Sequence, residues 1–215
     1  MLRKSLKAFE ARLSVGEHLF DQASKRSIAT GFSRLSHWQS CEGLVSYIWQ
    51  SWCAFCRETT LRSMTGTTTV SSMVVPRHPE AIGEGRVCYL VKSSFLGHIA
   101  KPGKEITDYW KEVTWGDSTA LAQFFAVYTP SNHLQLRGGL AYPTFAPDHL
   151  RIIRNASAHL SNTALADAAA LQTHYQGLVF RHPTDLIFWR SRSSGEIAFL
   201  EWIADFRSMA QLMCE

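Results

Sequence analysis

The spacing of apolar residues predicts a helix at each end of the chain. Near the start, apolar side chains recur at helical spacing through about residue 15, as on one face of an amphipathic helix. They are Leu2, Leu6, Phe9 and Leu13. The last helix has the same pattern, carried by Ile197, Leu200, Trp202, Ile203, Phe206, Met209 and Leu212. Ser193 and Glu196 precede it at the spacing of a capping box, which indicates where this helix begins.

A longer helix is predicted over residues 36–64. Apolar residues keep close to the helical repeat there, and no proline interrupts the run. They include Leu44, Ile48, Trp52, Phe55 and Leu61. Because several of these side chains are aromatic, we expect the helix to lie in the core of the fold.

The character of the chain changes after this helix. Residues 65–72 are almost entirely Thr, Ser and Gly, and further prolines and glycines follow up to position 85. The run at 87–91, Val-Cys-Tyr-Leu-Val, is short and apolar and could form a strand or an extended buried connection. We therefore interpret residues 65–103 as a long irregular insertion with room for a short strand pair.

Helical patterns return in the second half of the chain. The predicted stretches are 105–113, 117–128, a helix after 147 and an alanine-rich helix over 162–174. Asp117 and Asp148 are suited to cap the second and third of these, whereas residues 129–147 are broken by prolines and glycines. Several helices with little strand signal predict an all-α fold, a helical bundle, in a single domain over residues 1–215.

Composition narrows the class of protein. An apolar content of 46% over 215 residues is enough to bury a core. No stretch is apolar enough to span a membrane and the first residues lack the order of a secretory signal, so we expect a cytoplasmic protein. Five cysteines, an odd number, fit reduced thiols better than a disulfide framework. The net charge of +4 resides in residues 1–34, a basic helical segment that could attract RNA or form a solvated helix face.

The strongest sign of chemistry is an arginine followed five positions later by a histidine. These residues are Arg154 and His159, and Asn155 comes directly after the arginine. A neutral imidazole takes or gives a proton near neutral pH, and a guanidinium holds a phosphate through two parallel hydrogen bonds. Phosphodiester cleavage without a metal needs both groups. In a chain of this composition, chance gives roughly 0.06 matches to the motif with its polar second residue.

This segment resembles the R-x-x-x-x-H motif of the HEPN superfamily, small helical proteins many of which are ribonucleases. The resemblance implies a HEPN-type helical bundle with Arg154, Asn155 and His159 in its catalytic site. His159 would be the acid or base at the ribose 2′-hydroxyl or the leaving oxygen, and Arg154 would stabilise charge on the phosphoryl oxygens. Asn155 would orient the histidine or the phosphate. The resemblance implies cleavage of single-stranded RNA to a 2′,3′-cyclic phosphate, without metal or other cofactor.

Helix geometry limits what one copy of the motif can do. Arg154 and His159 lie about 140° apart around a straight helix, whereas Asn155 and His159 share a face. A joint site therefore needs a bend, a long side-chain reach or a second subunit. HEPN proteins are generally dimers whose motifs meet at a two-fold axis, so the resemblance implies a homodimer that acts on RNA. It also implies a toxin or effector of prokaryotic antiviral defence, with an antitoxin or another defence subunit as a further partner.

The motif leaves alternatives open. Some HEPN-like proteins are not catalytic, so the chain could instead be a dimerisation or interaction subunit of a defence or toxin-antitoxin complex. Glu58 on the long helix could approach Arg154 or Asn155 as a supporting residue. It could also be a surface charge that pairs with Arg62, four positions further on.

Other constellations carry less weight. Cys53 and Cys56 have the spacing of a redox pair but fall inside the long helix, where buried cysteines are the better interpretation. His78 and the Arg-His-Pro segment at 181–183 are in loop-like settings typical of solvated turns. The seven tryptophans are expected mostly in the core, although they could also stack on unpaired bases. Because no Gly-rich phosphate loop or second pair of zinc ligands is present, neither ATP chemistry nor a metal site is predicted.

Overall fold

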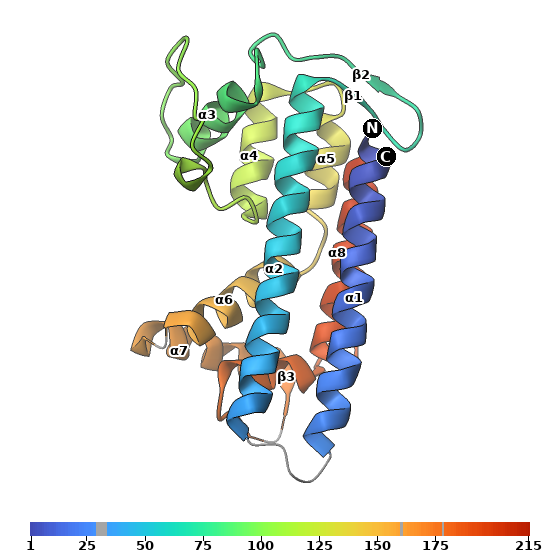
Figure 1. Ribbon diagram of the computed structural model, residues 1–215, viewed down its shortest axis with the longest axis vertical. Helices are drawn as coiled ribbons and strands as arrows, with labels where there is room; N and C mark the ends of the chain where they lie inside the picture. The colour runs from blue at the N-terminus through green and yellow to red at the C-terminus, as the bar shows by residue number, and fades with distance from the viewer. Residues whose placement is uncertain (29–33, 160, 178) are drawn as a thin grey trace. The chain divides into compact units, whose positions relative to one another are not determined.

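Helices make up most of the computed structural model (Figure 1). It describes residues 1–28, 34–159, 161–177 and 179–215. The predicted all-α fold class is confirmed, with short antiparallel strand pairs in addition. Within the described ranges, no helix combines the length and the apolar character that a membrane crossing requires.

The chain divides by its internal contacts into two compact units. Unit 1 comprises Met1–Phe9, Trp52–Pro143 and Ser208–Glu215, and unit 2 comprises Glu10–Ser51 and Thr144–Arg207. Three long helices supply residues to both units: α1 (Leu2–Ile28), α2 (Arg34–Thr65) and α8 (Ala198–Cys214). The single domain over residues 1–215 stays a prediction.

Unit 1 is built on an aromatic cluster and a set of packed helices. Phe9 of α1 stacks on Phe55 of α2 with ring centroids 4.6 Å apart, and its ring lies 5.9 Å from that of Trp52. The remaining elements are β1 (Thr67–Thr68), β2 (Val74–Val75), α3 (Glu84–Phe95), η1 (Tyr109–Lys111), α4 (Ser118–Tyr128) and α5 (His133–Leu140). α4 packs against both α3 and α5, and β1 pairs with β2 in antiparallel register.

The insertion at 65–103 is less irregular than predicted. It contains the β1–β2 pair, but the apolar run at 87–91 is neither a strand nor an extended connection, because it forms the middle of α3. Four of its five side chains are buried, and a helix with a wide apolar face can bury them together. Arg86 fixes this helix to the following loop by donating to the carbonyl oxygens of Lys101 and Lys104.

Two further predictions in unit 1 are wrong for reasons of packing. Helix α5 lies in the stretch 129–147 that was expected to be broken. A Cβ on Gly139 would lie 2.6 Å from the carbonyl oxygen of Met209, so this glycine lets α5 approach the backbone of α8. Conversely, the helix predicted at 105–113 is only the 3₁₀ turn η1, because none of the residues of that turn is buried.

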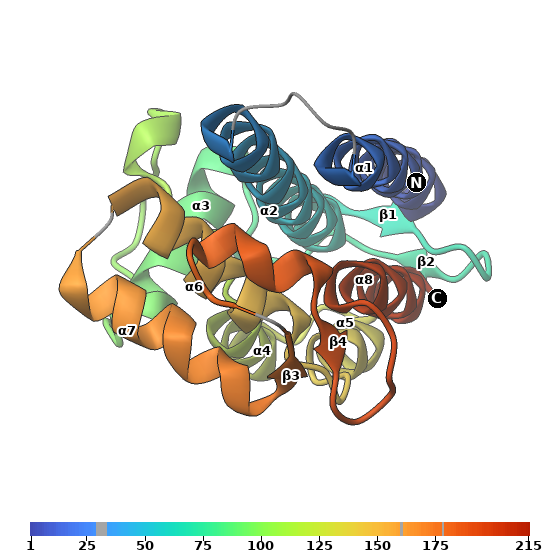
Figure 2. The same cartoon turned by 90° about the horizontal axis from the view of Figure 1, so that it is seen from below.

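Unit 2 contains the helix with the arginine-histidine motif. Its elements are α6 (Ala146–His159), α7 (Asn162–Ala170), η2 (Leu171–Thr173), β3 (Tyr175–Gln176), η3 (Pro183–Phe188) and β4 (Arg190–Ser191). Helix α6 packs against α7 and the 3₁₀ helix η3, while β3 pairs with β4 (Figure 2). Phe20 of α1 stacks on Phe188 and Phe199, with centroid distances of 5.2 and 4.7 Å.

The helix boundaries show which capping predictions hold. Asp117 caps α4, since its carboxylate accepts a hydrogen bond from the Ala120 backbone at 2.9 Å. Asp148 does not cap α6, because the helix begins two residues earlier and the Thr144 hydroxyl accepts from the Ala146 backbone. The capping box before α8 is also wrong: that helix starts only at Ala198.

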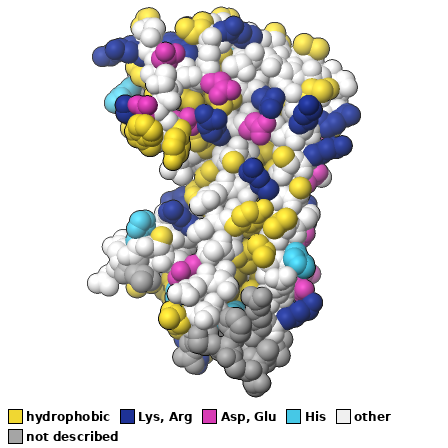
Figure 3. Space-filling model, viewed as in Figure 1, with side chains coloured by type: hydrophobic (Ala, Val, Ile, Leu, Met, Phe, Trp, Pro, Cys, Tyr) yellow, Lys and Arg dark blue, Asp and Glu magenta, His cyan; other side chains and the backbone are white. Residues whose placement is uncertain are grey.

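Helix α1 is longer than predicted and carries much of the positive charge. It continues to Ile28 rather than ending near residue 15. Lys4, Lys7, Arg12 and Lys25 on this helix are exposed. On the face seen in Figure 3, Lys and Arg side chains lie among acidic and apolar ones. Attraction of RNA and a solvated helix face both stay predictions for this segment.

Candidate functional site

Helix α6 presents the motif at its C-terminal end. Leu150, Ile153 and Ala156 are fully buried and recur at helical spacing, so they fix which face of α6 is turned inward. Arg154 and Asn155 are left half-buried, and His159, the last residue of the helix, is exposed. The imidazole of His159 is therefore accessible from solvent.

The side chain of Arg154 reaches over Asn155. Its Nη1 donates a hydrogen bond to Oδ1 of Asn155 at 3.1 Å. Because Asn155 and His159 share a helix face, this bond draws the guanidinium toward the side on which the histidine stands. The long reach of arginine thus reduces the angular separation that a straight helix imposes on the motif.

The hydrogen bond also determines which donors are left for a ligand. The Asn155 carbonyl oxygen accepts from Arg154, while its NH₂ group has two donors for an acceptor such as a phosphate oxygen. A guanidinium has five N–H donors, and among the described residues Arg154 uses a single one on another side chain. The end of α6 therefore combines a cationic donor cluster with an accessible imidazole.

Glu58 has a partner of its own in α2. Its carboxylate lies 2.8 Å from the Arg62 guanidinium, which is the four-residue pairing expected of a surface charge. Glu58 belongs to unit 1, whereas the motif belongs to unit 2. A supporting role for Glu58 at Arg154 or Asn155 stays a prediction.

The cysteine pair lies in the middle of α2, where Cys56 is buried but Cys53 only half-buried, so the prediction of two buried cysteines holds for Cys56 alone. Cys56 is fully buried, and burial raises the pKa of its thiol well above the usual value. A thiol that resists ionisation is a poor nucleophile, since the thiolate is the reactive form. All five cysteines lie in the described ranges, and none of them forms a disulfide.

Beneath α6 lies a buried polar chain that the sequence did not reveal. Trp202 Nε1 donates to the hydroxyl of Tyr175 at 2.8 Å, and this hydroxyl lies 2.6 Å from Nδ1 of His149. Among the described residues, Nδ1 of His149 is the one acceptor within reach of the Tyr175 hydroxyl proton, so we assign that proton to the bond with His149. Nδ1 of His149 therefore accepts, and the neutral ring carries its proton on Nε2. This chain ties α6 to β3 and α8 within unit 2.

The neutral state of His149 predicts a loss of stability in acid. Burial, aided by His174, lowers its pKa from 6.5 to about 4. The unfolded chain takes up this proton at a higher pH than the folded one, so the stabilisation is complete above pH 6.5 and is lost as the pH falls toward 4. The expected loss in the free energy of unfolding is roughly 3 kcal/mol.

Urea denaturation across this pH range measures the effect. His149→Asn keeps an acceptor for Tyr175 but cannot titrate, so its stability should depend less on pH than that of the unmodified protein. His78 and His182, whose pKa values burial also lowers, contribute equally to both proteins and cancel in the comparison. Parallel pH profiles for the two proteins would contradict this assignment.

The loop histidine at 182 is more ordered than a solvated turn residue. Its Nδ1 accepts from the Thr184 backbone at 3.3 Å, and its Nε2 lies 3.1 Å from Oε1 of Glu42. Its ring stacks on Trp38 with centroids 4.9 Å apart. His182 thus shapes the start of η3, which packs against α6.

The described residues were searched for metal sites, and the whole chain was compared with known proteins. Across the described ranges, no three or more His, Cys, Asp or Glu side chains are arranged to hold a metal ion. Comparison with models of known protein families, with curated proteins and with solved structures gives no match for this chain.

Proposed function

We propose that this chain is a HEPN-like endoribonuclease that cleaves single-stranded RNA without a metal. The observation that carries the proposal is the arrangement at the end of α6. An exposed His159 stands on the same helix face as Asn155, to which Arg154 is hydrogen bonded. Transfer of a phosphoryl group to the neighbouring 2′-hydroxyl requires an acid or base and donors to the phosphoryl oxygens, and these side chains supply both.

In the proposed reaction, the ribose 2′-oxygen attacks the adjacent phosphorus and the bond to the 5′-oxygen breaks. His159 takes the proton from the 2′-hydroxyl as the new P–O bond forms. Arg154 and the Asn155 amide donate to the phosphoryl oxygens, where negative charge increases. The leaving 5′-oxygen must also receive a proton. In a homodimer, the partner subunit's His159 supplies it, so one imidazole acts as base and the other as acid.

The biological role that fits this activity is that of a toxin or effector in prokaryotic antiviral defence. Cleavage of cellular RNA in the cytoplasm would then have to be restrained by an antitoxin or another defence subunit. The rival function is that of a non-catalytic dimerisation subunit in such a complex. In that case the motif residues would serve an interface and not a reaction.

Incubation of the purified protein with an unstructured, end-labelled RNA in EDTA tests the proposal. We expect cleavage at a rate that added Mg²⁺ does not raise, because the chemistry uses only side chains of the chain. An oligodeoxynucleotide of the same sequence should stay intact for want of a 2′-hydroxyl. Intact RNA together with a stable dimer, measured by light scattering, would support the interaction subunit instead.

A further inference from the structure

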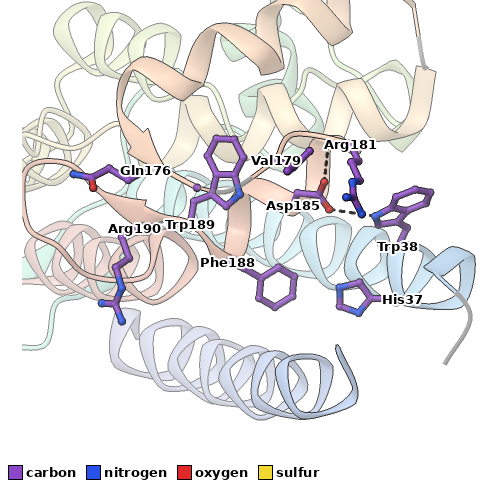
Figure 4. Close-up of a pocket in the computed structure, with 10 residues that line it drawn as sticks. His37, Trp38, Gln176, Val179, Arg181, Asp185, Phe188, Trp189 and Arg190 are labelled. Carbon is purple, nitrogen blue, oxygen red and sulfur yellow. Dashed lines mark hydrogen bonds between the residues drawn. The ribbon is translucent and has the colours of Figure 1, made fainter. Parts of the chain in front are cut away.

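Unit 2 contains an open groove, separate from the motif residues, with a volume of about 780 Å³. This volume is typical of sites that hold small ligands or parts of larger ones. The groove lies between the start of α2 and the segment from β3 to β4 (Figure 4). Its aromatic and basic lining residues are His37, Trp38, Arg181, Phe188, Trp189 and Arg190.

Aromatic rings line much of the groove and are held in place from behind. Trp38 is half-buried, stacks on His182 and donates from Nε1 to Oδ1 of Asp185 at 3.2 Å. Phe188, also half-buried, stacks on His37 with centroids 5.4 Å apart. Rings that are partly exposed and fixed in orientation offer platforms on which a planar ligand can stack at a small cost in entropy.

Among the charged residues that line the groove, the guanidinium of Arg181 is available to bind a ligand. Asp185 is a lining residue, but its Oδ2 accepts from the backbone N–H groups of Arg181 and His182, at 2.8 and 2.9 Å. This carboxylate is therefore engaged in holding the loop and the Trp38 indole. The exposed guanidinium of Arg181 has no hydrogen-bond or ion-pair partner among the residues that the structure describes. Arg181 and Trp38 both line the groove, and in the view of Figure 4 they are drawn on one side of it and Arg190 on the other.

The wall of the groove is connected to the motif helix. Phe188 is the last residue of η3, and η3 packs against α6 within unit 2. A strand bound in the groove would thus lie in the same unit as the residues proposed to cleave it. No segment of the described chain fills the groove.

We infer that this groove binds a segment of single-stranded RNA, with bases stacked on Trp38 and Phe188 and a phosphate held by Arg181. The inference rests on the proposed function, which it deepens by adding a substrate-binding site outside the catalytic motif. Stacking platforms beside an unpaired guanidinium suit unpaired bases joined by phosphates. A duplex would keep its bases stacked on one another and out of reach of these rings.

Fluorescence anisotropy with a labelled 2′-O-methyl oligouridine tests the inference. The methyl group blocks attack by the 2′-oxygen, so binding is measured on an intact probe. We expect Trp38→Ala to raise the Kd roughly 5- to 150-fold, the usual effect of losing one stacked base. Trp38→Phe, which keeps a ring, should have a smaller effect.

Arg181→Gln gives a second and independent readout. Because the side chain is exposed and unpaired among the described residues, its replacement should not affect folding. Loss of one phosphate contact should reduce the slope of log K against log salt concentration by about one. Arg137→Gln on α5 is the matched control, since Arg137 is also exposed, and both affinity and slope should stay unchanged.

The outcomes separate this inference from the proposed function. His98→Ala, at an exposed position of unit 1 outside both the motif and the groove, should bind the probe as tightly as the unmodified protein. If the probe binds through the groove but RNA is never cleaved, the ribonuclease proposal fails, whereas the inference that the groove binds single-stranded RNA is supported. The inference is overturned if the unmodified protein does not bind the probe. It is also overturned if Trp38→Ala and Arg181→Gln bind the probe as tightly as the unmodified protein does.

Discussion

Replacing His159 by alanine is expected to lower the rate of RNA cleavage by about 10²- to 10⁴-fold, the usual contribution of a positioned acid or base. The side chain is exposed at the end of α6 and has no hydrogen-bond partner among the described residues, so its loss should not alter the fold. Initial rates on an end-labelled RNA in EDTA measure the effect. Thermal unfolding followed by circular dichroism checks that the variant remains folded.

His98→Ala is the control for this prediction. His98 is also exposed but lies in unit 1, after α3 and away from the motif in the sequence, so we expect unchanged cleavage. An unchanged cleavage rate for His159→Ala would show that the imidazole takes no part in the reaction. Equal losses in both variants would indicate a general effect of surface histidines instead of a reaction at α6.

The largest effect on stability is expected from Tyr175→Phe. Removal of the hydroxyl leaves Nδ1 of His149 without its donor and Nε1 of Trp202 without its acceptor, and both residues are buried. Each unsatisfied buried group costs about 1–3 kcal/mol, so the free energy of unfolding should fall by roughly 2–4 kcal/mol. Urea denaturation near neutral pH measures this loss.

Tyr47→Phe provides the matched comparison. Tyr47 lies on α2 in the same unit and its hydroxyl has no partner among the described residues, so the loss should stay within about 0.5 kcal/mol. Similar losses for Tyr47→Phe and Tyr175→Phe would mean that the chain beneath α6 contributes nothing specific.

Periodic apolar patterns predicted much of the helical fold. The long helix α2 and the alanine-rich helix α7 are found close to the predicted residues, and Asp117 caps α4 as expected. In these segments the local pattern and the packing agree. Helix α3 was missed because most of the run at 87–91 is buried, and a short apolar run does not distinguish a helix from a strand.

Helix α5 was missed because Gly139 is needed for close packing against α8, which lies far away in the sequence. Gly138 and Gly139 suggest a break when the neighbouring sequence alone is considered. The close approach of Gly139 to the α8 backbone depends on residues some seventy positions away. Local propensity cannot reveal such a contact, and here tertiary packing overrides it.

The candidate site could be predicted in its residue types but not in its contacts. The sequence identified Arg154, Asn155 and His159 from the chemistry of their side chains. The hydrogen bond from Arg154 to Asn155 depends on the conformation of a long side chain, which spacing does not fix. The hydrogen bonds that link His149, Tyr175 and Trp202 join residues distant in the sequence, so no local motif predicts them.

The chemical ends of the RNA fragments test the central claim most directly. Attack by the neighbouring 2′-oxygen leaves a 2′,3′-cyclic phosphate on one fragment and a 5′-hydroxyl on the other, and mass spectrometry distinguishes both from other ends. We predict these ends in EDTA, and no cleavage where a 2′-deoxynucleotide replaces the one ribonucleotide whose 2′-oxygen would attack. Fragments with a 5′-phosphate, or cleavage at the deoxy position, would contradict the mechanism assigned to α6.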